Sequence, residues 1–379
     1  MIQVTLSNEI LRRISAIDEN RFSMNAAKLP PVTANGLRKN SKKKSAYASN
    51  RIEGNPLTES QADTAIEKDA HKHFLKPEQE IRNYFMALEV LEQKCKQKEP
   101  LSMALILQIQ ALVEKGASKK KIGLRGAMLP GVLFAVYDAE SGAAEYIPPD
   151  YQEVPALLEE LVHYVNTTDD HPLLAAAVVH YQLVTIHPFE DGNGRTARLL
   201  SGYILDLNGY GFQGIGSLEE YFAYDPEEYY RSLQMGLPPL YYDGRENLPH
   251  PEIWIHYFLR MVELYSNKVC ELSVHSQEEG LYENLSHLRP KETVLLQHLL
   301  AHRCYEITPM EISKAVTVSN KTIINRCVRL ATHGFVIPVI VKERIRFYKI
   351  SSYAISNRER ILEIGKENEN SESFAKGRT

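Results

Sequence analysis

Residues 187–198 read HPFEDGNGRTAR and join two apolar stretches of the chain. In these stretches, 173–186 and 195–207, apolar side chains recur every three or four residues, which predicts helices. The junction holds a histidine, a carboxylate, two glycines and two arginines within twelve positions. A turn that only connects two helices needs none of these groups, so we expect this loop to carry chemistry.

The junction is suited to binding phosphates. Gly192 and Gly194 let backbone N–H groups converge on an anion, and the helix that begins there directs its positive dipole end to the same point. Arg195 and Arg198 lie three residues apart on one helix face, so their guanidinium groups would clamp a di- or triphosphate. Asp191 offers an oxygen ligand of the kind that Mg²⁺ uses together with phosphate oxygens.

His187 supplies a candidate base. An imidazole with an ordinary pKa near ~6.5 can take a proton from a hydroxyl group at neutral pH. Phe189 is expected instead to fill the core and hold the loop in shape. Taken singly, a histidine before a proline at a helix end and a Gly-Asn-Gly turn are compatible with purely structural roles. Together with the arginines and the carboxylate, they favour a functional site.

The stretch resembles the Fic signature H-P-F-x-[DE]-G-N-G-R-x-x-R at every fixed position. This resemblance implies a helical Fic fold over roughly residues 45–275 and transfer of AMP from ATP to a Ser, Thr or Tyr hydroxyl of a protein, itself included. His187 would be the base and Asp191 would hold Mg²⁺. The implied nucleotide-binding residues are Gly192, Asn193, Gly194, Arg195 and Arg198. In that arrangement the asparagine and the glycine amides orient the α-phosphate, and the arginines hold the β- and γ-phosphates.

Residues 49–54, Ser-Asn-Arg-Ile-Glu-Gly, resemble the inhibitory motif [ST]-x-x-x-E-[GN] of one class of Fic proteins. Without that resemblance, the segment is a short helix with Ser49 as its N-cap and Gly54 as its terminator. The resemblance implies that Glu53 pairs with Arg198 and occupies the position that the γ-phosphate needs. Activity at rest would then be low.

Residues 129–147 alternate as a β-hairpin around a turn at 138–142. The hairpin lies where the Fic family has its flap, here 127–147, which pairs with an extended segment of the target protein by strand addition. The residues expected to dock the target are Leu133, Phe134 and Ala135. The alternative is an exposed hairpin without this role.

Tyr229 and Tyr230 belong to a segment, 228–233, that resembles the Y-Y-x-x-L stretch closing over the adenine in the family. Tyrosines at this spacing are equally compatible with a helical core. The sequence does not distinguish which of the two would contact the adenine.

The rest of the catalytic region is predicted to be mainly α-helical. Residues 1–110 would form an N-terminal helical region that carries the inhibitory motif, and 111–275 the Fic core. Residues 28–56 are rich in Pro, Asn, Ser and Lys, which favours a connecting segment over the surface. Further helices are predicted at 80–91, 103–113, 154–165 and 250–275.

The pattern changes after residue 289. Three short helices at 290–302, 308–316 and 319–333 are followed by a β-rich stretch at 336–350, which favours a winged-helix domain spanning 285–352. Residues 289–350 contain eleven basic and four acidic residues. The candidate DNA contacts are Lys321, Arg326, Arg344 and Arg346. Protein docking or dimerisation is the alternative use of such a domain, and a polar tail at 363–379 is expected to be disordered.

Composition limits the remaining possibilities. A net charge of −4 and a pI near 6.4 exclude a protein that is basic throughout. Four scattered cysteines indicate reduced thiols rather than a zinc site or a disulfide framework. No uninterrupted apolar stretch approaches ~18 residues, so a cytoplasmic protein with no membrane partner is expected.

Three alternative functions stay open at this point. The donor could be another nucleotide, such as UTP or a phosphocholine nucleotide, because the loop recognises phosphates and not the base. The reaction could run as removal of AMP from a modified protein, with Glu53 positioning a water. The chain could also be a DNA-binding regulator that senses ATP, and a homodimer is a further expectation.

Overall fold

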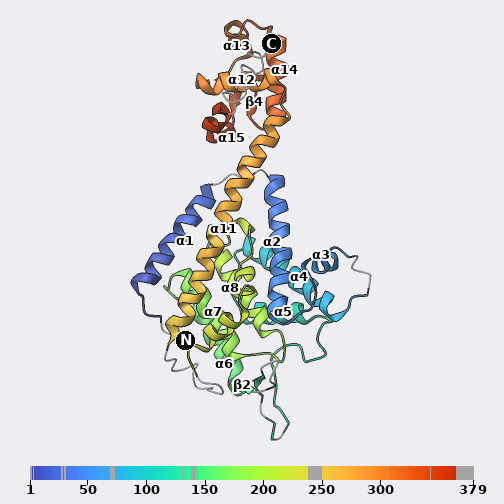
Figure 1. The fold of residues 1–379 in the computed structure, drawn as a ribbon, viewed down its shortest axis with the longest axis vertical. Helices are drawn as coiled ribbons and strands as arrows, with labels where there is room; N and C mark the ends of the chain where they lie inside the picture. Colours follow the sequence, from blue (N-terminus) through green and yellow to red (C-terminus); the bar gives the residue numbers. More distant parts are fainter. Residues whose placement is uncertain are drawn as a thin grey trace, which may run out of the picture. The chain divides into compact units, whose positions relative to one another are not determined.

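The structure, a computed structural model, describes residues 2, 4–26, 29, 31–68, 73–129, 131, 132, 134–137, 142, 144–237, 250–304, 306–341 and 343–363. It is mostly helical, which confirms the predicted fold class (Figure 1). The chain divides into two compact units, one of residues 1–27 and 31–273, the other of 28–30 and 274–379. In the described residues, no helix has the length and apolar character needed to cross a membrane.

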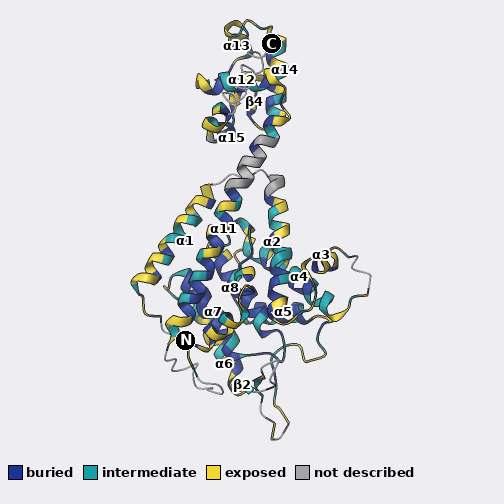
Figure 2. Ribbon diagram, viewed as in Figure 1, coloured by how far each residue is buried: buried dark blue, intermediate teal, exposed yellow. Residues whose placement is uncertain are grey.

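The core of the first unit is built around α7 (Pro172–Ile186) and α8 (Asn193–Leu207), which pack against each other. α7 is buried along almost its whole length, in keeping with its mostly apolar sequence (Figure 2). α4 (Lys76–Lys96) and α5 (Met103–Glu114) pack on α8, and α6 (Val154–Thr167) packs on α7. The loop 187–192 is therefore held between the two most buried helices.

Residues 28–56 do not form a surface connection, and that prediction was wrong. After α1 (Asn8–Ala26), residues Pro31–Ile52 form a single helix, α2. The serines at positions 41, 45 and 49 lie four residues apart on one face, are buried and are hydrogen-bonded into the unit. A polar composition suggested exposure, but buried polar groups are stable where each has a partner.

Shorter elements complete the first unit. They are α3 (Glu59–Glu67), a 3-10 helix η1 (Phe212–Gly214), α9 (Glu219–Phe222) and α10 (Pro226–Gln234). The predicted hairpin is present with shorter strands: β1 (Val136–Tyr137) pairs antiparallel with β2 (Ala144–Tyr146). Leu133 and residues 138–141 of the hairpin lie outside the described residues.

The second unit follows the predicted order of helices and strands. α11 (Pro251–Ser286) begins in the first unit, and its residues 274–286 belong to the second. The elements that follow are α12 (Pro290–Ala301), β3 (Glu306–Ile307), α13 (Pro309–Ala315), α14 (Asn320–Thr332), β4 (Val336–Val341), β5 (Arg344–Ile350) and α15 (Ser352–Ser356). The strands form an antiparallel sheet in the order β3-β5-β4. Residues 364–379 of the predicted tail lie outside the described residues.

Candidate active site

The loop between α7 and α8 is held by its own side chains. His187 ends α7 in the left-handed conformation, with φ 49° and ψ 57°, which turns the chain out of the helix. The Asn193 side chain bridges the loop, because Oδ1 accepts a hydrogen bond from Phe189 N (3.0 Å) and Nδ2 donates one to Phe189 O (2.9 Å). The Phe189 ring is fully buried, as expected. In this conformation the Asn193 amide shapes the loop rather than presenting itself to a phosphate.

His187 is prepared to act as a base. Its Nδ1 lies 3.2 Å from the carbonyl oxygen of Val184, which requires the proton on Nδ1 and leaves Nε2 as the basic nitrogen. Burial lowers the pKa of His187 to about 4, and the neighbouring Arg125 guanidinium acts in the same direction. The imidazole is therefore neutral at neutral pH.

A segment that sequence reasoning missed, 118–125, runs beside the loop. It contacts the loop at successive positions: Ser118 Oγ to Asp191 Oδ2 (3.3 Å), Lys120 Nζ to Glu190 O (3.1 Å), a backbone bridge from Leu124 to Phe189, and Arg125 N to Pro188 O (2.9 Å). No spacing pattern in the sequence marks this segment. These contacts hold the loop along the segment 118–125.

Arg125 connects this segment to the hairpin and to the candidate base. Its Nε donates to the carbonyl oxygen of His187 (2.8 Å), and Nη2 donates to Pro149 O (2.5 Å), just beyond the hairpin. The guanidinium group lies 4.8 Å from the centre of the Phe134 ring, which is 6.0 Å from the imidazole of His187. The hairpin residue Phe134 therefore lies beside the base, and Ala135 next to it is half-buried.

Arg198 is buried and bound by the end of α2. Nη2 lies 2.5 Å from Glu53 Oε1, and Nε donates to Ser49 Oγ (2.8 Å). A Cβ added to Gly194 would lie 2.5 Å from the same Glu53 oxygen. The Glu53 carboxylate thus lies against the first turn of α8, where the helix dipole favours an anion. The side chain of Glu53 is 33% exposed, while that of Arg198 is 1% exposed.

The structure distinguishes the two tyrosines. Tyr229 is buried, with its hydroxyl 3.3 Å from Arg198 Nη1 and 2.8 Å from Nε2 of His180. Tyr230 is 44% exposed, and its hydroxyl donates to Ile52 O (3.3 Å) at the end of α2. Tyr229 is thus a core residue that supports Arg198, and Tyr230 is the more exposed of the two.

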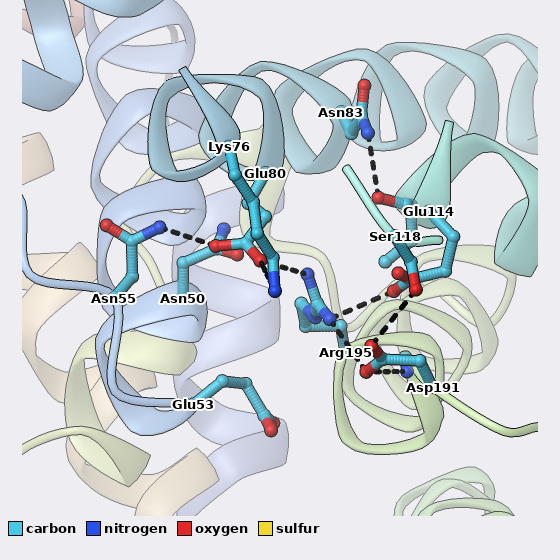
Figure 3. Close-up of polar contacts among 12 residues, drawn as sticks. Asn50, Glu53, Asn55, Lys76, Glu80, Asn83, Glu114, Ser118, Asp191 and Arg195 are labelled. Atoms are coloured by element: carbon cyan, nitrogen blue, oxygen red, sulfur yellow. Dashed lines mark hydrogen bonds and ion pairs between the residues drawn. The ribbon is translucent and has the colours of Figure 1, made fainter. Parts of the chain in front are cut away.

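Arg195 is surrounded by three carboxylates (Figure 3). Nη2 lies 2.9 Å from Glu114 Oε1 and 3.4 Å from Asp191 Oδ1, and Nη1 lies 4.0 Å from Glu80 Oε1. Burial raises the pKa of Glu114 to about 7. Neither glutamate was singled out from the sequence, because each lies on a helix remote in the chain from the loop.

The second unit presents three of its four candidate DNA contacts to solvent. Lys321, Arg344 and Arg346 are exposed, and Arg326 is half-buried. Exposed apolar side chains lie on the same hairpin of β4 and β5, at positions 337, 340 and 345.

The site combines a neutral histidine, a helix N-terminus and two buried arginines on a helical fold. These groups are of the kind that bind phosphate compounds. Residues 100–205 match the model of the Fic/DOC family. The protein adenylyltransferase Fic of Drosophila mojavensis is 30% identical over 209 residues, covering 52% of this chain and 38% of that protein. The same enzyme of Drosophila melanogaster is 28% identical over 213 residues, covering 52% and 39%. The match thus spans less than half the length of these relatives.

Solved structures show the same fold. A Fic family protein from Desulfovibrio desulfuricans G20 superposes with a TM-score of 0.58 at 19% identity, covering 93% of this chain and 98% of that one. Fic-1 (residues 134–508) from C. elegans superposes with a TM-score of 0.54 at 22% identity, covering 71% and 73%. At these identities the likeness concerns the fold.

Proposed function

We propose that this protein is an adenylyltransferase that transfers AMP from ATP to a hydroxyl side chain of a protein, itself included, and that Glu53 inhibits it. The observation that carries the proposal is the Glu53–Arg198 contact at the first turn of α8. A carboxylate there occupies the N-terminal end of α8, which follows the loop that begins at the neutral His187. A nucleoside triphosphate would need the same helix end for its phosphates. The named relatives, protein adenylyltransferases, support the same activity.

In the proposed reaction, the target hydroxyl oxygen forms a bond to the α-phosphorus of ATP while the bond to pyrophosphate breaks. Nε2 of His187 takes the hydroxyl proton, and pyrophosphate leaves with the negative charge that Arg195 and Arg198 stabilise. The rate gain would come mainly from positioning and from preorganised charge. The hairpin beside His187 would hold the target segment by strand pairing.

Asp191 would hold a Mg²⁺ ion, which neutralises phosphate charge when it is bound with ATP. Its Oδ2 accepts a hydrogen bond from Ser118, and its side chain is 32% exposed. Among the described residues, no group of three or more His, Cys, Asp or Glu side chains is arranged to hold a metal by itself. A single carboxylate fits a cation that brings phosphate and water ligands with it.

The inhibition would act on the phosphates. With Glu53 on Arg198, the γ-phosphate loses its guanidinium partner and ATP cannot adopt the in-line geometry. In the alternative reading, the same carboxylate positions a water that removes AMP from a modified protein. Incubating AMP-modified target with the unsubstituted chain and measuring released AMP would separate the two roles.

The decisive experiment is intact-mass analysis of the Glu53→Gly protein after incubation with ATP and Mg²⁺. We expect a mass gain of one or more AMP groups, and no gain in the Glu53→Gly, His187→Ala double variant. A panel of other nucleotides in the same assay identifies the donor. If the Glu53→Gly protein gains no mass with ATP, the adenylyltransferase proposal fails.

For the second unit, we propose a winged-helix domain that binds DNA. Its element order and the exposed Lys321, Arg344 and Arg346 support this role. Binding of the full chain to mixed-sequence duplex DNA, measured by anisotropy at two salt concentrations, tests it. We expect weaker binding at high salt and in the Arg344→Ala, Arg346→Ala variant. No salt-dependent binding would favour protein docking through the exposed isoleucines of the same hairpin.

A further inference from the structure

Arg195 lies close to more than one carboxylate, and one of these is the proposed metal ligand. The guanidinium group is buried, and its two nearest carboxylates are Glu114 and Asp191, at 2.9 and 3.4 Å. Asp191 is also the proposed Mg²⁺ ligand. An arginine paired fully with that carboxylate would compete with the cation for it, since both are attracted by the same negative charge.

Glu114 is placed to prevent this competition. Its side chain is 3% exposed, against 32% for Asp191, so the attraction of the ionised Glu114 for Arg195 is less screened by water. Because its pKa is raised to about 7, Glu114 is mostly ionised only above neutral pH, so the test of its role is made at about pH 8. A Cβ added to Gly192 would lie 2.5 Å from Glu114 Oε1, so the carboxylate packs directly on the loop. Asn83 Nδ2 donates to the carbonyl oxygens of Val113 and Lys115, which fixes the end of α5 on both sides of Glu114.

Glu80, the third carboxylate, has other partners. Its Oε1 lies 3.6 Å from Lys76 Nζ and 4.0 Å from Arg195 Nη1, and its Oε2 accepts a hydrogen bond from Asn55 Nδ2 (2.9 Å) (Figure 3). Its charge is therefore largely balanced within α4 and by the segment that follows Glu53. Glu114 is the nearest carboxylate to Arg195, at 2.9 Å, although Arg195 Nη2 also donates a hydrogen bond to Asp191 Oδ1 (3.4 Å).

We propose that Glu114 is a positioning residue that holds the Arg195 guanidinium group towards α5, so that Asp191 keeps its carboxylate for a divalent cation bound with the nucleotide. The inference rests on the proposed function, because Asp191 is a metal ligand only in that function. Without the Glu114 charge, Asp191 becomes the nearest carboxylate to Arg195, and the cation must displace an arginine in order to bind.

The test measures metal binding without turnover. In the Glu53→Gly, His187→Ala background, Mn²⁺ is titrated with ATP held below the protein concentration, and free Mn²⁺ is followed by electron paramagnetic resonance. The same titration of ATP without protein gives the Mn²⁺ that ATP binds alone. Glu114→Gln, which keeps the volume and removes the charge, should weaken Mn²⁺ binding about 10-fold or more, as outer-shell substitutions at metal sites commonly do. ATP affinity without a divalent cation, measured by calorimetry, should stay within about twofold.

Two further variants make the result specific. Glu114→Asp keeps the charge on a shorter side chain and should recover part of the Mn²⁺ affinity. If the glutamine variant does not fold, Glu114→Asp still tests the position of the charge. Glu292→Gln removes a comparable buried carboxylate, 2.8 Å from Arg329 in the second unit, and should leave Mn²⁺ binding unchanged. Thermal unfolding reports whether each variant is folded.

Each outcome has a defined meaning. If the Glu114→Gln variant binds Mn²⁺ with the same affinity as the Glu53→Gly, His187→Ala parent, the positioning role is overturned and the proposed function still stands. Equal losses of ATP affinity with and without the cation also overturn it, since they indicate a structural role alone. If the parent binds no Mn²⁺ with ATP, both the inference and the proposed metal site fail.

Discussion

Replacing Glu53 by glutamine should activate the protein partially, and replacing it by glycine should activate it further. The contact of Glu53 with buried Arg198, at 2.5 Å, is a hydrogen bond between two charged groups. Such bonds contribute about 1.5–3 kcal/mol, so losing the bond should shift the balance between blocked and open sites by about 10- to 140-fold. Glutamine keeps an acceptor oxygen without the charge. Because charge-assisted bonds are about twice as strong as neutral ones, the glutamine variant should shift the balance between blocked and open sites by about 3- to 12-fold.

The assay is the initial rate of self-labelling with radiolabelled ATP at one protein concentration. The expected order is unsubstituted protein, then Glu53→Gln, then Glu53→Gly. Glu59→Gln, an exposed glutamate at the start of α3, is the matched control and should label like the unsubstituted protein. A glutamine variant that is as inactive as the unsubstituted protein would refute the reasoning, because inhibition would then depend on the volume of residue 53 and not on its charge.

Three further predictions concern residues of the candidate active site. Between pH 9 and 6, His187 stays neutral and should cause no change in the self-labelling rate of the Glu53→Gly variant. The rate should fall as the pH approaches about 4, where the imidazole gains a proton. Initial rates measured across this range test the prediction. Tyr229→Phe should lower the free energy of unfolding by about 1–3 kcal/mol, measured with urea, because buried Arg198 loses a partner. Tyr230→Ala should weaken ATP binding several-fold in calorimetry and change that free energy by less than ~0.5 kcal/mol.

Apolar periodicity predicted most helices of the first unit well. Helix α5 begins and ends within one residue of the predicted 103–113, and α7 within one residue of 173–186, because each is set by a continuous buried stripe. The same criterion missed α2, whose buried face is built from serines and alanines. The serines of that face are buried because they hydrogen-bond to groups distant in the chain. The sequence of the helix alone does not show these partners.

The candidate site was predictable to the extent that its residues are adjacent in sequence. The loop groups from His187 to Arg198 lie within twelve positions, so their combination is visible before folding. Glu114 and Arg125 reach the loop only because α5 and the segment after it pack beside it. Tyr229 and Tyr230 are neighbours in sequence, yet one is buried and the other exposed. The packing of the helix decides this difference, so the sequence did not predict it.

Inhibition by Glu53 and anchoring of α2 are separable in this structure. The last turn of α2 brings Glu53 to Arg198. Ser45 and Ser41 lie about two and three turns before Glu53. Ser45 Oγ donates to Glu219 Oε2 (2.7 Å), and Ser41 Oγ accepts from Gly216 N (2.6 Å). These two bonds involve no group that a nucleotide would contact. A phosphate that displaces the carboxylate therefore leaves α2 docked. Relief of inhibition then requires movement of only the helix end, which is less costly than releasing a helix of 22 residues with one buried face.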